Sequence, residues 1–349
     1  MKNATDDKLL GALRTQAQAL GFDDVGLCSA LPFEEWSRAA WDALKERLRG
    51  DPRELMPEAR AIVVGVRRYD AFEPWPQGSG EIANYYTASN AGHDRAEALS
   101  QWLRERGHRA LANPPLPHRA AALRSGLGYQ GQNQQFCHEE LGVLVSLHLV
   151  LTDAPLPVQD APYRTCEGCG LCVQTCPTGA LSEGSFDRLR CLRHHMIGAE
   201  AVPMELREAM GARLLGCTEC TLSCPHADAQ VQRIPEEVLQ ACGLESLLRG
   251  RPEAVEALQR AVGANFARKH RLQAQAALAA GNSGDRSLIP ALAELLLEHP
   301  NQVARCHSAW ALGRLGGHEA EDALRTALEA EKDDAVRAEI KLALAAMQW

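Results

Sequence analysis

The chain carries two runs of cysteine between residues 166 and 224 whose spacing is suited to binding metal. The first run is Cys166-Glu-Gly-Cys169-Gly-Leu-Cys172-Val-Gln-Thr-Cys176-Pro177, with the spacing C-x2-C-x2-C-x3-C-P. A loop of this kind supplies three thiolates to three irons of one [4Fe–4S] cubane. In two-cluster proteins its fourth cysteine binds the other cubane, so the run predicts a second one elsewhere in the chain.

The second run, Cys217-Thr-Glu-Cys220-Thr-Leu-Ser-Cys224-Pro225, lacks the first cysteine of the motif, because Leu214 stands in its place. Cys191 lies between the two runs and is the natural substitute. The crossing rule then assigns four ligands to each cluster: Cys166, Cys169, Cys172 and Cys224 to one, and Cys176, Cys191, Cys217 and Cys220 to the other. We therefore predict two [4Fe–4S] clusters and an electron-transferring, redox-active protein.

Zinc sites are the alternative, since C-x2-C pairs also bind zinc. The triple run and the two Cys-Pro endings favour iron–sulfur clusters, because zinc sites do not need them. The other four cysteines stand singly in apolar or helical surroundings, where buried and unreactive thiols are common: Cys28, Cys137, Cys242 and Cys306. We expect none of these four to be a ligand.

Three regions are expected along the chain. Residues 1–155 alternate helices and strands, which predicts an α/β domain. A segment rich in Pro and Asp at 153–161 marks its end, because these residues disfavour both helix and central strand. Residues 156–230 form a two-cluster module like that of bacterial ferredoxins, and residues 231–349 are helical.

Apolar periodicity places the main elements of the first region. The expected helices and strands are helices at 8–20 and 95–106 and strands at 61–66 and 143–151. In the last region the phrases AQAALAAGNSGDRSLIPALAELL and HSAWALGRLGGHEAEDALRTAL both have the pattern of helix, glycine-containing turn and helix. Such an echo predicts stacked helical repeats, with a nonrepetitive bundle as the alternative.

The composition is that of an ordinary globular protein, with 46% hydrophobic and 23% charged residues among 349. No apolar run is long enough to span a membrane, and the start, MKNATDDKLL, is unlike an export signal. We therefore expect a cytoplasmic protein that does not bind membranes. The net charge of −8 argues against indiscriminate binding of nucleic acid, although basic stretches occur at 188–195 and 268–271.

With these parts assembled, the chain resembles the epoxyqueuosine reductase family over nearly its whole length. The matching phrases include GFDDVGL, DPRELMPEARAIVVGVRRY, SGLGYQGQN, LTDAPLP, all eight cysteines, GNSGD and AWALGRLG. The resemblance implies an α/β domain that binds cobalamin, two clusters that supply it with electrons, and C-terminal HEAT-like repeats that help to hold tRNA. The implied reaction reduces epoxyqueuosine to queuosine in the tRNA anticodon region.

The phrase that carries the family's proton-donating aspartate is altered in this chain. Family members have D-x-A-P-x-x-E-R before A-G-L-G-W, whereas this chain has ANPPLPHR before SGLGY. The aspartate position therefore holds Ala112 or, with a shift of one residue, Asn113, and neither is a carboxylic acid. His118 is the candidate for a replacement acid, because histidine titrates near neutrality; an exposed loop histidine is the alternative.

Further departures fall in the region that the resemblance assigns to corrinoid and substrate. YTASNAGH stands where the family has a pattern close to Y-x-R-G-x-D-Y-H, and Gln132 stands where the family carries Lys or His. The candidate corrinoid-binding residues are His93, Gly128 and Asn133. The electron-delivery module is complete in this sequence, while the expected reaction chamber is changed.

The expected partners are the tRNA anticodon region and an electron donor such as flavodoxin or ferredoxin, and we expect a monomer. The basic stretches at 188–195 and 268–271 are candidates for phosphate contact, against the ordinary alternative of solvated surface charge. Two other functions remain open. One is a related corrinoid iron–sulfur reductase acting on a small molecule or a corrinoid protein, and the other is a noncatalytic electron carrier.

Overall fold

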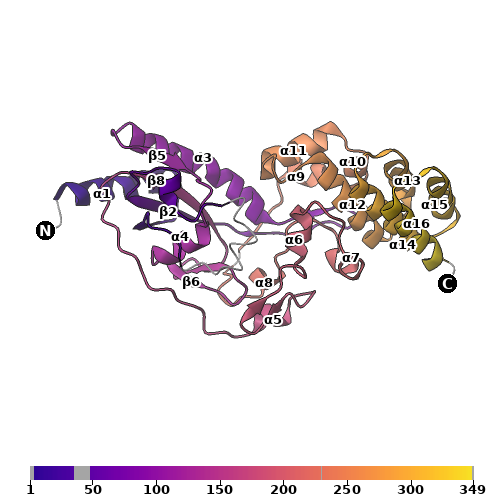
Figure 1. Cartoon of the computed structure of the whole chain (residues 1–349), viewed down its shortest axis with the longest axis horizontal. Coiled ribbons are helices and arrows are strands. Elements are labelled where there is room, and N and C mark those ends of the chain that lie inside the picture. Colours follow the sequence, from indigo (N-terminus) through magenta and orange to yellow (C-terminus); the bar gives the residue numbers. More distant parts are fainter. Residues whose placement is uncertain (1–3, 35–47, 229, 348–349) are drawn as a thin grey trace. The chain divides into compact units, whose positions relative to one another are not determined.

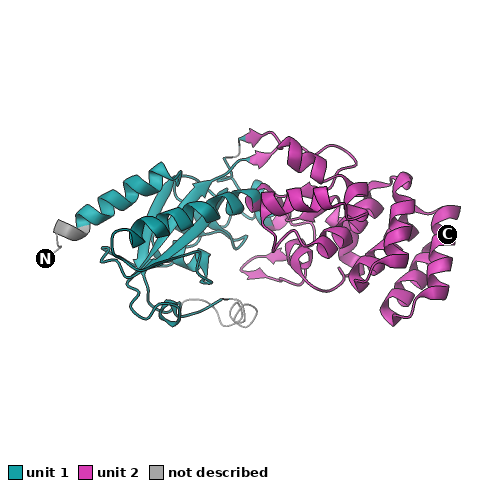
Figure 2. Cartoon of the chain, turned by 90° about the horizontal axis from the view of Figure 1, so that it is seen from above, with its two compact units in different colours: residues 1–70, 87–172, 220–230 teal, residues 71–86, 173–219, 231–349 magenta. Residues whose placement is uncertain are grey.

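The structure, a computed structural model, describes residues 4–34, 48–228 and 230–347. Two compact units share these residues, and each is built from separate stretches of the chain (Figure 2). Unit 1 comprises residues 1–70, 87–172 and 220–230, and unit 2 comprises 71–86, 173–219 and 231–349. The three regions expected from the sequence remain a prediction, because the two compact units have different boundaries.

A four-stranded antiparallel sheet forms the centre of unit 1 (Figure 1). The strand order is β1 (Asp24–Ser29), β2 (Ala61–Arg68), β8 (Val145–Thr152) and β5 (Ala110–Ala112). Every neighbouring pair is antiparallel. The mixed α/β character predicted for this region is confirmed, and the strands expected at 61–66 and 143–151 correspond to β2 and β8.

Both faces of this sheet are buried, which explains the unbroken apolar run of β2. Ala61 and Val63 face one side, where they pack with α1 (Ala4–Ala19) and α3 (Asn84–Arg104). Ile62 and Val64 face the other side, where α4 (His118–Arg124) covers them. The alternation follows from the two-residue period of a strand. The helix expected at 95–106 is the second half of α3.

A short hairpin follows α4 in unit 1 and leads toward the cysteines. Its strands β6 (Gly128–Gln130) and β7 (Phe136–His138) pair antiparallel, with Tyr129 opposite Cys137. In addition to its pairing within the hairpin, Gln130 of β6 forms backbone hydrogen bonds with Arg164 and with Cys166, each of 2.9 Å. The hairpin is therefore extended sideways by the segment that enters the first cysteine run.

Unit 2 begins with small strand pairs that tie distant parts of the chain together. β3 (Ala71–Phe72) pairs in parallel with β12 (Val231–Gln232), and β4 (Glu81–Ile82) pairs in parallel with β11 (Arg213–Leu215). The remaining elements between these strands are β9 (Leu181–Ser182), β10 (Ser185–Phe186), α6 (Leu192–Ile197) and α7 (Met204–Met210). Two further short helices carry cysteines, and the chain passes from one unit to the other within each of them: α5 (Leu171–Gln174) and α8 (Glu219–Leu222).

The rest of unit 2 is helical and contains the expected repeats (Figure 1). It comprises α9 (Glu236–Ala241), α10 (Leu244–Leu248), α11 (Pro252–Val262), α12 (Lys269–Ser283), α13 (Ile289–Glu298), α14 (Gln302–Leu315), α15 (His318–Ala330) and α16 (Asp334–Ala346). The two echoing phrases form the pairs α12–α13 and α14–α15, as predicted.

Small residues allow successive repeat helices to pack closely. A Cβ atom on Gly281 of α12 would lie 2.8 Å from the Cα of Ala311 in α14. One repeat later, a Cβ on Gly313 of α14 would lie 2.8 Å from the Cβ of Ala343 in α16. The same contact thus recurs at equivalent positions, which is the behaviour of a repeat array. Trp310 of α14 is a core residue, with 8% of its surface exposed.

In the part of the chain that the structure describes, no helix is both long and apolar enough to cross a membrane.

Candidate functional site

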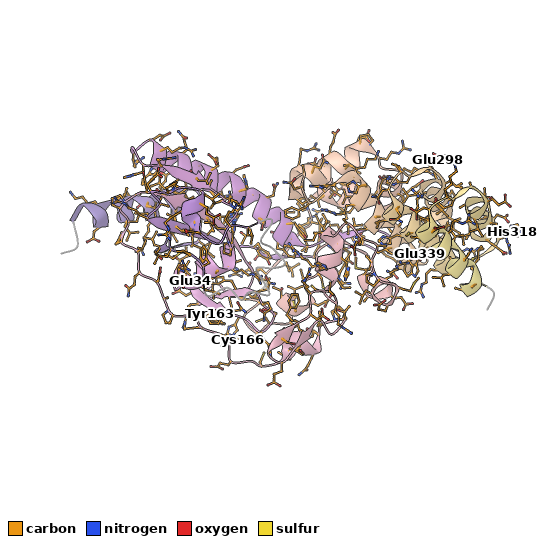
Figure 3. The ribbon with its side chains drawn as sticks, viewed as in Figure 1. Glu34, Tyr163, Cys166, Glu298, His318 and Glu339 are labelled. Carbon is orange, nitrogen blue, oxygen red and sulfur yellow. The ribbon has the colours of Figure 1, made fainter. Side chains whose placement is uncertain are left out.

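Four of the eight predicted ligands lie together in unit 1. Burial raises the pKa of the Cys172 thiol, and the neighbouring Cys169, Cys166 and Cys224 raise it further. The pKa of Cys224 is likewise raised by burial, with Cys169 and Cys166 adding to the effect. Thiols affect one another in this way only at short range, so the first three cysteines of one run meet the last cysteine of the other. Cys166 is labelled in Figure 3.

Unit 2 contains three of the other predicted ligands, Cys176, Cys191 and Cys217. The fourth, Cys220, lies three residues after Cys217 in the sequence. Burial raises the pKa of Cys217, and Cys191 contributes to the increase. Burial also acts to raise the pKa of Cys176, but backbone N–H groups, led by that of Thr178, outweigh it and lower the pKa. Cys191 precedes α6 directly. The replacement of the missing motif cysteine by Cys191 therefore has a local geometric basis.

The donor set fits iron–sulfur clusters. All twelve cysteines are free thiols, and a cubane takes one thiolate at each of its four irons. Among the described residues, no three His, Cys, Asp or Glu side chains converge closely enough to hold a single metal ion. A cubane does not require such convergence, because its ligands surround a cluster rather than one ion.

The tip of the β6–β7 hairpin contacts both cysteine runs within unit 1. The backbone N–H of Gln132 donates to Sγ of Cys166 over 3.2 Å. The side chain of Asn133 donates from Nδ2 to the carbonyl oxygen of Cys220 over 2.8 Å and accepts from the N–H of Gln135. Asn133 therefore holds the hairpin tip to the second cysteine run. Its predicted contact with corrinoid stays a prediction.

Gly128, the second predicted corrinoid contact, has a structural reason to be glycine. A Cβ there would lie 2.0 Å from the carbonyl oxygen of Cys137 on the paired strand. Cys137 is buried, as expected, but it does not stand alone, because its pKa is raised by burial and also by Cys224 and Cys166. Its thiol lies 3.2 Å from the hydroxyl of Tyr129. Cysteine spacing could not reveal this proximity, since Cys137 is outside both runs.

Three histidines gather beside the sheet of unit 1. Burial, together with the smaller effects of His118, Arg67 and His93, lowers the pKa of His148, on β8, to about 3. Gly92 of α3 makes room for this ring, because a Cβ there would lie 2.0 Å from Nε2 of His148. Sequence reasoning did not select His148, although a histidine within the apolar run VSLHLVL is a usable signal.

His118 begins α4, and its Nδ1–H donates to the carbonyl oxygen of Leu147 over 3.1 Å. Burial lowers its pKa, although hydrogen bonds to the carbonyls of Leu147 and Pro114 oppose the change. His118 is half-buried at the start of a helix, so the alternative of an exposed loop histidine is wrong. His93 lies within α3, and its side chain is 63% exposed.

The two candidates for the missing aspartate differ in their surroundings. Ala112 ends β5, and its side chain packs against the apolar cluster beneath α1 and α3. Asn113 follows in the loop, in the left-handed backbone region with φ of 43°, and its Nδ2 donates to the carbonyl oxygen of His93 over 3.2 Å. Asn113 is thus the position whose polar side chain lies beside the histidines.

The part of unit 1 near the hairpin also fits the predicted corrinoid. Gln132 has a buried side-chain oxygen that finds no hydrogen-bond partner among the described residues. A buried polar atom normally has a partner, and a corrin ring carries amide side chains at its edge whose N–H groups could supply one. The neighbouring Gln130 and Gln134 pair with each other over 2.8 Å, so the hairpin tip presents an amide-rich surface.

Comparisons with known proteins agree with these parts. The model for a 4Fe–4S double cluster binding domain matches residues 165–227, and the model for HEAT repeats matches residues 267–345. Epoxyqueuosine reductase from Bacillus cereus is 28% identical over 94% of this chain and 94% of its own.

Two solved structures extend the comparison to the fold. Epoxyqueuosine reductase from Bacillus subtilis, with an aspartate-bearing catalytic loop swung out of its active site, matches with a TM-score of 0.86 at 26% identity over 98% of this chain and 99% of its own. An epoxyqueuosine reductase with an epoxyqueuosine-modified tRNA-Tyr stem loop matches with a TM-score of 0.86 at 25% identity over 98% and 100%. The chain belongs to the epoxyqueuosine reductase family.

Family membership confirms several predictions at once. The chain is an oxidoreductase with two [4Fe–4S] clusters and cobalamin as cofactors, and its C-terminal helices are HEAT-like repeats. Similarity over the whole chain does not identify individual ligands or catalytic residues. These stay predictions, supported by the geometry described above.

Proposed function

We propose that this chain reduces epoxyqueuosine to queuosine in the anticodon region of tRNA. The observation that carries the proposal is the full-length match to epoxyqueuosine reductases, one of them with an epoxyqueuosine-modified tRNA stem loop, combined with a complete set of cluster cysteines. The net change removes the epoxide oxygen as water and consumes two electrons and two protons. Each of these requirements can be assigned to a part of the chain.

Electrons are delivered through the cysteine module. One cluster is assigned to Cys166, Cys169, Cys172 and Cys224, and the other to Cys176, Cys191, Cys217 and Cys220. Cys169 is exposed, and Leu171, two residues later, is 40% exposed. An exposed ligand with an apolar rim suits a brief encounter with a small redox protein such as flavodoxin or ferredoxin.

Cobalamin, when bound, supplies a low-valent cobalt that is both a strong reductant and a nucleophile. The residues assigned to its environment are Gln132, through its buried side-chain oxygen, together with His93, Gly128 and Asn133. The guanidinium of Arg67, near His148, favours negative charge nearby, such as that on an opening epoxide oxygen.

Proton delivery is assigned to His118, with Asn113 holding the adjacent loop. The Nδ1–H of His118 donates to the Leu147 carbonyl, and the proton to be transferred is one carried by the imidazolium form. Because burial lowers the pKa of His118, this form is scarce at neutral pH. A slower proton step than an aspartic acid would give is the expected consequence.

Binding of tRNA is assigned to the basic start of α12. A cleft of about 580 Å³ in unit 2 is lined by Lys269, His270, Gln273, His299, Pro300 and Asn301. Arg268 precedes the helix, so two cations and a helix N-terminus lie together beside this cleft, where a phosphate would be favoured. The stretch at 188–195 is the second candidate contact. We place this monomeric enzyme in the cytoplasm, where its tRNA substrate resides.

A second function keeps the same cofactors but changes the substrate. The loss of the family's aspartate at Ala112 and Asn113 favours a corrinoid iron–sulfur reductase that acts on a small molecule or a corrinoid protein. The test uses the full chain, reconstituted anaerobically with iron, sulfide and cobalamin, and an anticodon stem loop that contains epoxyqueuosine. Mass spectrometry should detect queuosine after reduction. Bound clusters and cobalamin with an unchanged epoxide would favour the second function.

A further inference from the structure

The β6–β7 hairpin holds a backbone N–H against a sulfur atom assigned to a cluster. Residues 131–134 form a tight turn, in which the N–H of Gln134 donates to the carbonyl oxygen of Gly131 over 2.9 Å. The N–H of Gly131 donates to the carbonyl oxygen of Gln135 over 2.8 Å. The N–H of Gln132 takes part in neither bond and donates to Sγ of Cys166 instead, over 3.2 Å.

The surrounding contacts fix this N–H in place. Gln130, two residues earlier, is bonded to the Arg164 carbonyl and to the Cys166 N–H, each over 2.9 Å. One residue later, Asn133 is 5% exposed and clamps the Cys220 carbonyl over 2.8 Å. The donor is therefore anchored on both sides, and its sulfur acceptor belongs to a segment that is itself hydrogen-bonded to the hairpin.

An N–H donor on a ligand sulfur changes the energetics of electron transfer. Reduction adds negative charge to the cluster and its thiolates, and a hydrogen bond to sulfur stabilises the more negative state. Since the Gln132 N–H is preorganised by the turn, little reorganisation opposes this stabilisation. The result is a higher reduction potential for the cluster that Cys166 binds.

We propose that Gln132 is a positioning residue for electron transfer, whose backbone N–H raises the reduction potential of the cluster bound by Cys166, Cys169, Cys172 and Cys224. This role rests on the assigned ligand set and not on the proposed reaction. It goes beyond the family match, because the hairpin lies 34 residues from Cys166 in sequence and carries no motif for it.

A matched pair of variants isolates the N–H group. Gln132 is the second residue of the turn, where proline is favoured, so Gln132→Pro removes the N–H with little strain. Gln132→Ala removes the side chain and keeps the N–H. The background for both variants is Cys191→Ala, in which only the cluster bound by Cys166 is expected to remain. In an EPR-monitored redox titration of this chain, Gln132→Pro should lower the midpoint potential of that cluster. At the wild-type midpoint, its ratio of reduced to oxidised cluster should fall about three- to tenfold.

In chain reconstituted with iron and sulfide but without cobalamin, Gln132→Ala should titrate like the wild type, and identical titrations for both variants would overturn the proposal. A second measurement does not depend on the proline variant folding. In wild-type chain labelled with ¹⁵N-glutamine, pulsed EPR of the reduced cluster should show a ¹⁵N coupling, and Gln132→Ala should convert it to ¹⁴N. If no ¹⁵N coupling is found, the hydrogen bond is absent. Retention of both clusters by Cys166→Ala would instead show that the ligand set is wrong.

Discussion

At the scale of residues, positions 112 and 113 are the two candidates for the place of the family's proton-donating aspartate. Asn113 lies in the loop after β5 and contacts the backbone of α3 at His93, whereas Ala112 packs against the apolar core. A carboxylic acid at position 113 would lie beside the histidine group. The same group at position 112 would be pressed against apolar side chains, where its burial is costly.

The variant Asn113→Asp should therefore raise the rate of epoxide reduction by roughly 10- to 100-fold, within the range of a positioned general acid. The matched variant Ala112→Asp should give no such gain and should reduce stability. Nucleoside mass spectrometry in single-turnover experiments measures the rates, and thermal unfolding measures stability. A larger gain from Ala112→Asp would place the missing acid at position 112 instead.

The role of His118 predicts a distinctive pH dependence. Burial lowers its folded-state pKa below the ordinary value of histidine, so the imidazolium form is lost as pH rises through that lowered pKa. If His118 is the acid, the rate should fall by up to about tenfold per pH unit above it. His118→Gln should be slower and should lose this pH dependence. A variant that is slower but keeps the wild-type profile would restrict His118 to a structural role.

At the scale of elements, the cysteine runs could be predicted because cluster ligands follow local spacing. C-x2-C-x2-C-x3-C-P needs only one loop, and the family model and the closeness of Cys166, Cys169, Cys172 and Cys224 agree with that interpretation. The helix–turn–helix repeats could be predicted for the same reason, since each is a local unit.

Contacts between elements far apart in the sequence could not be predicted from the sequence. The bond from Gln132 to Cys166 depends on how the β6–β7 hairpin pairs with a later segment. The setting of His148 depends on Gly92 of another element. The helix expected from residue 95 begins at Asn84. The polar residues of YTASNAGH give no clear apolar period, so tertiary contacts decide that this segment is helical. Contacts between residues distant in sequence produce no periodic pattern of residues that sequence analysis could detect.

Cys191 is the ligand assignment that most needs a test, because it stands outside both runs. Cys191→Ala should reduce the iron and acid-labile sulfide content by about half and leave one cluster visible by EPR. Cys137→Ala is the matched control, since Cys137 lies near Cys166 and Cys224 but is not assigned as a ligand. It should keep both clusters. Full iron content in Cys191→Ala would remove Cys191 from the ligand set.

At the scale of the whole molecule, one chain combines two iron–sulfur clusters, a cobalamin cofactor and HEAT-like repeats. Epoxyqueuosine reductase from Bacillus cereus is covered over 94% of its length, so the order of these parts is retained. The changes from the family are concentrated in phrases near the expected reaction chamber. We therefore predict that substrate binding and electron transfer are intact while proton delivery is slow.

Binding of tRNA should depend on the basic start of α12. Lys269→Ala combined with Arg268→Ala should weaken binding of an anticodon stem loop roughly tenfold and flatten its dependence on salt, because each phosphate contact releases counterions. Lys332→Ala, in the turn between α15 and α16, is a control that should change little. Filter binding at two salt concentrations distinguishes the cases. Unchanged affinity in the double variant would move the contact away from α12.

The ratio of queuosine formed to reductant consumed is the decisive measurement for epoxide reduction by this chain. The wild-type chain, carrying both clusters and cobalamin, is given a limiting amount of reductant and an excess of epoxyqueuosine-containing stem loop under anaerobic conditions. We predict one queuosine for every two electrons consumed, and none when cobalamin is omitted. Consumption of reductant with the epoxide left intact would contradict epoxyqueuosine reduction by this chain.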